Sequence, residues 1–259
     1  MPHSIVKRVW DYSAYSKKFL AFILILLFIS SLIQSYIQIS GNSLEITFIN
    51  ILVFILLGGY GMTITRDRIN HGKRLPKIEI RKILVFGIKS TIVIFTYVYV
   101  QGVILDFICS PLHFPAFDLE EMLLEWPHTL HMLYTHNPVN TIIFLVVGAV
   151  LFYAFSFFME IALAKLADTN RILSSFNLIS IKRSIDVIGW RNYVKEYTLI
   201  ILVIVFLSYL MSLEVPFFFI DALKDVFLSF FIFATQFLGI GAIYCRIKDE
   251  ESRIHVPVE

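Results

Sequence analysis

Long apolar runs with few charges dominate this chain and restrict it to folds that live in a lipid bilayer. A helix that crosses a bilayer needs about 20 predominantly apolar residues. Hydrophobic residues make up 58% of the 259 positions, against about 45 to 50% in soluble domains. Runs close to the required length cover residues 19–39, 46–64, 86–109, 139–163, 197–213 and 223–244. The sequence predicts an all-α polytopic membrane helical bundle of about six transmembrane helices, as a single integral membrane domain over residues 1–259.

The distribution of Lys and Arg predicts the orientation. When residues 39–45, 105–138 and 213–225 are assigned to the outer side, Lys224 is the one basic residue there among the 22 in the chain. Basic residues accumulate on the cytoplasmic side of membrane proteins. We therefore expect a cell-membrane protein with a cytoplasmic N-terminal segment (1–18) and a cytoplasmic tail (246–259). Cys109 and Cys245 then lie at opposite ends of their spans, where a disulfide within one chain cannot join them.

Two basic segments, 78–89 and 181–195, fall on the predicted cytoplasmic side. In the first, Lys82 and Lys89 project to one side of a helix and Ile80 and Ile83 to the other, which indicates an amphipathic interfacial helix ahead of the third span. An ordinary charged flank is the alternative. We expect both segments to bind anionic lipid headgroups, through Lys82, Lys89, Lys182 and Arg183.

The outer loop, residues 110–138, is acidic and rich in histidine. Apolar residues within 119–133 recur at steps of three and four, which predicts an amphipathic helix there as well. Glu125, His128 and His131 stand at three-residue steps and are candidate zinc ligands by residue type. The polar face of a surface helix would show the same pattern, so the metal site stays an alternative.

Glu160 is the acid set most deeply in an apolar run. It lies about 31 Å along the helix from Val139, near the inner interface rather than the midplane. A charge in that position needs a partner. Arg66 or Arg68, at the inner end of the second span, would form an intramembrane ion pair with it, and a proton or ion relay is the alternative.

Two blocks of residues carry a family resemblance. The chain resembles the domain-of-unknown-function 4013 family, multi-pass membrane proteins found largely in archaea, over about residues 45 to 245. The matching residues are Gly59-Tyr60-Gly61, Arg66-Asp67, Ile69, Gly72, Leu75-Pro76 and Gly87-Ile88-Lys89, then Glu160-Ile161-Ala162, Ala164, Leu166 to Thr169, Phe176-Asn177, Ile188-Gly189-Trp190 and Tyr193. The resemblance implies a membrane location and a shared fold, and it transfers no activity. Gly72 by its position suits a helix end that requires a positive φ.

An internal repeat is a further hypothesis. Residues 80–89 are echoed by 181–191, so spans two and three are candidates for a duplication of spans four and five. Basic loops that converged on the same pattern are the alternative.

Motifs give little direct guidance to activity. The sequence contains no Walker loop, Gly-x-Ser-x-Gly or Cys-x-x-Cys pattern, so we expect no catalytic residues and no cofactor. Topology and lipid account for the basic residues, so we expect no nucleic-acid partner. The favoured function is a membrane-embedded interaction, lipid-associated or assembly protein, with anionic lipid and either a protein partner or a second copy as partners. A small-solute or ion transporter or channel is one alternative, and an intramembrane enzyme is another.

Overall fold

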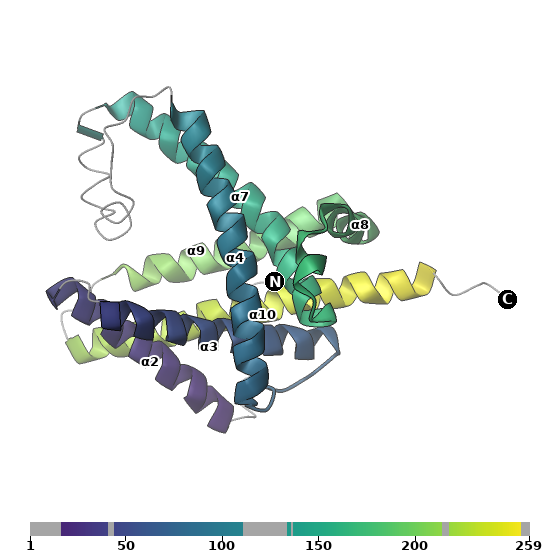
Figure 1. Ribbon diagram of the computed structural model, residues 1–259, viewed down its shortest axis with the longest axis horizontal. Helices are drawn as coiled ribbons and strands as arrows, with labels where there is room; N and C mark the ends of the chain where they lie inside the picture. Colours follow the sequence, from purple (N-terminus) through teal and green to yellow (C-terminus); the bar gives the residue numbers. More distant parts are fainter. Residues whose placement is uncertain (1–16, 41–43, 111–133, 136, 214–217, 255–259) are drawn as a thin grey trace. The chain divides into compact units, whose positions relative to one another are not determined.

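All elements of the described structure are helices (Figure 1). The computed structural model describes residues 17–40, 44–110, 134–135, 137–213 and 218–254. The helices are α2 (Lys17–Ser40), α3 (Leu44–Ile69), α4 (Ile80–Cys109), α7 (Pro138–Thr169), the short 3-10 helix η2 (Ile172–Phe176), α8 (Leu178–Ile188), α9 (Trp190–Met211) and α10 (Phe218–Ile254).

Five described helices are long and apolar enough to cross a membrane. They include Phe48–Ile69, Ile80–Cys109, Pro138–Thr169, Trp190–Met211 and Leu223–Arg253, and α2 adds a shorter apolar helix, Leu20–Ile33. The polytopic all-α fold is therefore confirmed. The number of six spans stays a prediction, because the apolar helix found within α2, Leu20–Ile33, is shorter than a full crossing.

The chain divides into two compact units. Unit 1 comprises Met1–Val93 and Glu160–Glu259, and unit 2 comprises Ile94–Met159. Helices α4 and α7 each contribute to both units, because the division falls within them.

In unit 1, α3 and α10 pack at very short range. The Thr65 hydroxyl, which is buried, donates a hydrogen bond to the Phe237 carbonyl at 3.0 Å. A Cβ atom at Gly241 would meet the Arg68 side chain and the Thr65 carbonyl. Small residues at contacts of this kind allow two backbones to approach closely, which is how helices associate in lipid without a hydrophobic driving force between them.

A second close contact joins α3 to the first turns of α4. A Cβ at Gly59 would collide with the Ile83 carbonyl, and a Cβ at Gly87 would collide with the Ile55 carbonyl. These two glycines are both in the first block of family-matching residues. Their role is steric, since backbone atoms cannot move aside as the end of a side chain can.

The predicted interfacial helix before the third span is not a separate element. Helix α4 begins at Ile80 and continues without a break to Cys109. Gly87 does not interrupt it, because that glycine packs against α3. The amphipathic pattern is thus the first turns of a long spanning helix.

The positive φ predicted for Gly72 falls on His71 instead, which has a φ of 59°. The Gly72 amide donates to the Asp67 carbonyl at 2.8 Å, closing the end of α3. A Cβ at Gly72 would collide with the Asp67 carboxylate. Gly72 is therefore needed because it lacks a side chain, and not because its backbone has a positive φ.

Unit 2 is built from the later part of α4 and the earlier part of α7. Asn137 begins α7: its side-chain oxygen accepts from the Asn140 amide at 3.2 Å, and Pro138 occupies the first helical position. Large apolar side chains are exposed on both helices, including Phe95 and Phe107 of α4 and Phe152 of α7. Lipid is the medium in which such surfaces are stable.

We expect Gly87→Ala to lower the stability of the protein by about 1 to 3 kcal/mol, because the new methyl group must displace the Ile55 backbone. Thermal unfolding of the purified protein in one detergent measures this. Gly102→Ala is the matched control on the same helix, since nothing lies within 4 Å of a Cβ there. The better helix propensity of Ala should leave that variant as stable as the parent or more so. Equal losses in both variants would contradict the close contact.

Candidate functional site

Helix α8 is a short amphipathic helix with well-defined ends. The Asn177 side chain accepts a hydrogen bond from the Ser180 amide at 2.9 Å and so caps its N-terminus. Gly189, with a φ of 84°, ends it by donating to the Ile185 carbonyl at 2.9 Å. Its buried residues are Ile181, Ser184, Ile185 and Ile188. The opposite face of α8 is therefore exposed.

That outward face and the preceding η2 segment combine exposed apolar and basic side chains. Leu173, Leu178 and Ile179 are 84%, 62% and 80% exposed. Lys182 and Arg183, one turn along from Ile179, are exposed as well. We call these five residues the basic-apolar surface. Apolar groups next to Lys and Arg on a short amphipathic helix are typical of segments that lie in a membrane interface.

Other lysines of unit 1 hold this segment in place. The buried Lys165 ammonium of α7 donates to the Ser180 carbonyl at 2.8 Å and to the Ser180 hydroxyl. Lys89 of α4 donates to the carbonyl and to the side-chain oxygen of Asn170, both at 2.8 Å. These charges fasten α8 and the end of α7, so they are committed to protein contacts.

Lys182 and Arg183 differ from those lysines. No hydrogen bond or ion pair of either side chain occurs in the described part of the chain. Lys82, in the first basic segment, forms an ion pair with Glu79 at 2.8 Å, with both side chains more than half exposed. Of the four residues predicted to bind lipid, Lys82 and Lys89 therefore already have protein partners.

The loop between α3 and α4 lies against α3. Leu75 is buried, and the Tyr60 hydroxyl donates to the Pro76 carbonyl at 3.1 Å. These contacts fasten the loop to α3, and Lys73, Arg74 and Lys77 are exposed. The loop is thus fixed in position with its basic side chains outward.

Glu160 is buried in unit 1 at 7% exposure. Its Oε1 accepts a hydrogen bond from the Gln236 side-chain amide of α10 at 3.2 Å, and its Oε2 is buried with no hydrogen-bond partner among the described residues. The structure does not bring it together with either predicted arginine. The Arg66 guanidinium lies over the Phe86 ring at 5.7 Å, and Arg68 donates to the Gly72 carbonyl at 3.4 Å.

A small pocket lies beside Glu160, between α7, α9 and α10. Its other lining residues are Ile161, Tyr193, Tyr197, Ile200, Ile240 and Ile243. The space within it is enough for about one water molecule. Sequence reasoning identified the buried acid but missed its partner Gln236, which lies 76 positions away.

The candidate metal ligands Glu125, His128 and His131 lie outside the described residues. Both cysteines are buried thiols that form no disulfide.

The helices and their apolar exposed faces define a polytopic α-helical membrane protein. A family model described as "Protein of unknown function (DUF4013)" matches residues 44–215. The chain belongs to this family, as the two blocks of matching residues predicted. No curated protein and no solved structure matches the chain.

We expect Glu160→Ala to lower stability by about 1 to 3 kcal/mol, because it leaves the Gln236 amide buried without its acceptor. Glu160→Gln should cost less than the Ala variant, since the amide oxygen can accept the same hydrogen bond. Melting temperatures of the two variants and the parent protein, in the same detergent, measure the difference. A loss in the Gln variant as large as in the Ala variant would point to an ionic partner.

Proposed function

We propose that this protein is a lipid-associated protein of the cell membrane, whose basic-apolar surface lies among the headgroups of the cytoplasmic leaflet. The observation that carries the proposal is the exposure of Leu173, Leu178 and Ile179 beside Lys182 and Arg183. This surface projects from α8 and η2, which are not themselves spanning helices.

The energetics favour a membrane interface over water. Moving a Leu or Ile side chain out of water is worth about 1.5 to 3 kcal/mol. Each Lys or Arg near an anionic surface adds about 1 kcal/mol. The long stems of Lys182 and Arg183 can lie against acyl chains while their charges reach the phosphates.

The small size of the pocket at Glu160 supports this proposal over a conduit. The pocket at Glu160 is lined mainly by Ile and Tyr side chains. A conducting pathway needs a continuous row of polar groups or a water-filled space. The pocket provides neither within the described residues, since it has room for about one water.

The proposal includes an orientation with both termini cytoplasmic, supported by the asymmetry of Lys and Arg. With single cysteines introduced at Lys73 and Glu121, we expect a membrane-impermeant maleimide to label Glu121→Cys in intact cells. Lys73→Cys should be labelled after permeabilisation only. Background from Cys109 and Cys245 should be low, because both are buried. The reverse labelling pattern would show that both termini lie on the outer side.

We expect the double variant Lys182→Gln, Arg183→Gln to retain less anionic lipid than the parent protein after purification. The reason is the loss of about 1 kcal/mol per charge at the interface. The measurement is the amount of bound acidic lipid per chain, by native mass spectrometry after exposure to mixed acidic and zwitterionic lipid.

Two further variants serve as controls. Lys89→Gln removes the same charge but breaks the bonds to Asn170, so it should lower the melting temperature and leave lipid retention unchanged. Leu178→Ser with Ile179→Ser keeps the charge and removes the apolar anchor, so it should weaken retention of both lipid classes. Equal retention by the parent and the Lys182, Arg183 variant would refute the proposed role of this surface.

A further inference from the structure

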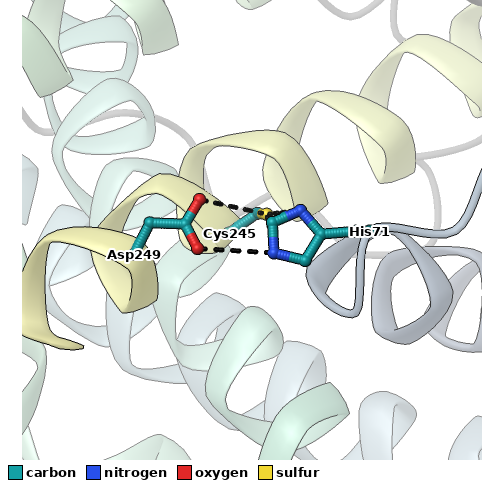
Figure 2. A group of neighbouring side chains, drawn as sticks. All are labelled: His71, Cys245 and Asp249. Carbon is teal, nitrogen blue, oxygen red and sulfur yellow. Dashed lines mark hydrogen bonds and ion pairs between the residues drawn. The ribbon is translucent and has the colours of Figure 1, made fainter.

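Three side chains with metal-ligating atoms converge where the loop after α3 meets α10 (Figure 2). His71 comes from the loop, and Cys245 and Asp249 come from α10. The His71 Nε2 atom lies 3.3 Å from Asp249 Oδ1 and 3.9 Å from the Cys245 sulfur. The sulfur lies 4.0 Å from Asp249 Oδ2. One ligand atom from each of the three side chains lies within 4.8 Å of the other two.

These separations are close to those of a tetrahedral zinc site. Zinc binds thiolate sulfur at about 2.3 Å and imidazole nitrogen or carboxylate oxygen at about 2.0 to 2.2 Å. Tetrahedral angles with those bond lengths place neighbouring ligand atoms about 3.4 to 3.6 Å apart. The His71–Asp249 separation of 3.3 Å meets this geometry, and side-chain rotation must bring the sulfur closer to the same ring nitrogen and carboxylate oxygen.

The backbone positions all three side chains for such contact. Cys245 and Asp249 are four residues apart on α10 and so lie on one face of the helix. His71 has a φ of 59°, in the left-handed region where most residues are strained. In that conformation the imidazole lies against α10, where it contacts Cys245 and Asp249.

The burial of the three groups suits a site with one open position. Cys245 is buried at 8% exposure, whereas the His71 and Asp249 side chains are 68% and 46% exposed. The sulfur is shielded while solvent reaches the other two ligands, so water or a fourth ligand can complete the coordination. Thiolate, imidazole and carboxylate together favour zinc over the oxygen-binding magnesium and calcium.

We propose that His71, Cys245 and Asp249 form a zinc-binding site that fastens the loop after α3 to α10. On binding, the Cys245 thiol releases its proton and the sulfur becomes the third protein ligand. The site links residues 174 positions apart. A metal ion that binds the folded chain raises its stability in proportion to the logarithm of the metal concentration.

The test uses the full chain, purified in detergent and stripped with a chelator, with Co²⁺ as the probe. We expect one Co²⁺ per chain and a thiolate-to-cobalt absorption band, which Zn²⁺ then displaces. Added Zn²⁺ should also raise the melting temperature. Cys245→Ser should abolish the band, and Asp249→Asn should weaken binding by about tenfold or more, as losses of coordinating or supporting groups do.

The variant His71→Asn separates an effect on folding from an effect on metal binding. Asn tolerates the left-handed conformation better than most residues, so this variant should keep its metal-free melting temperature and lose the rise with Zn²⁺. Cys109→Ser, and His128→Asn with His131→Asn in the outer loop, are controls that should bind as the parent does. Absence of the band in the parent protein would overturn the proposal, as would a band that depends on Cys109 or on the outer histidines instead.

Discussion

Lipid as the surrounding medium is the constraint on which this structure depends. Backbone amides and carbonyls find no partners in the hydrocarbon layer, so each crossing segment must satisfy its own groups as a helix. Helices that are all apolar gain little from meeting one another, and their association depends on close contact. In this chain, such close contact occurs where α3 packs against α4 and α10, at Gly59, Gly87 and Gly241.

Polar side chains hold the ends of several helices in place. Lys165 and Lys89 hold α8 and the last turn of α7 by hydrogen bonds to Ser180 and Asn170, and Lys248 of α10 pairs with Asp168 at 2.8 Å. Each of these lysines has a fixed partner within the protein. Under the proposed function, Lys182 and Arg183 are instead the charges that would contact the membrane surface.

The sequence predicted the apolar helices better than their ends or their partners. Hydropathy is a local property, so the third and sixth apolar runs were found, but α4 starts at Ile80 and α10 continues to Ile254, beyond their apolar parts. Partners depend on contacts distant in sequence. Glu160 meets Gln236 rather than an arginine, and no periodicity could reveal that. The spacing of Cys245 and Asp249 on α10 was a local signal, yet His71 completes the cluster from far away in the chain.

Helix α10 connects these features, because one continuous helix carries several of the contacts that matter. Gln236 meets Glu160 of α7, the Phe237 carbonyl accepts from α3, and Cys245 lies against His71. At 1.5 Å per residue, Gln236 and Cys245 are about 14 Å apart along the helix axis. A rigid helix cannot change one of these contacts without straining the others. An ion bound at the His71 end would therefore restrict α10 at the buried Glu160 as well, and couple the loop after α3 to the interior of unit 1.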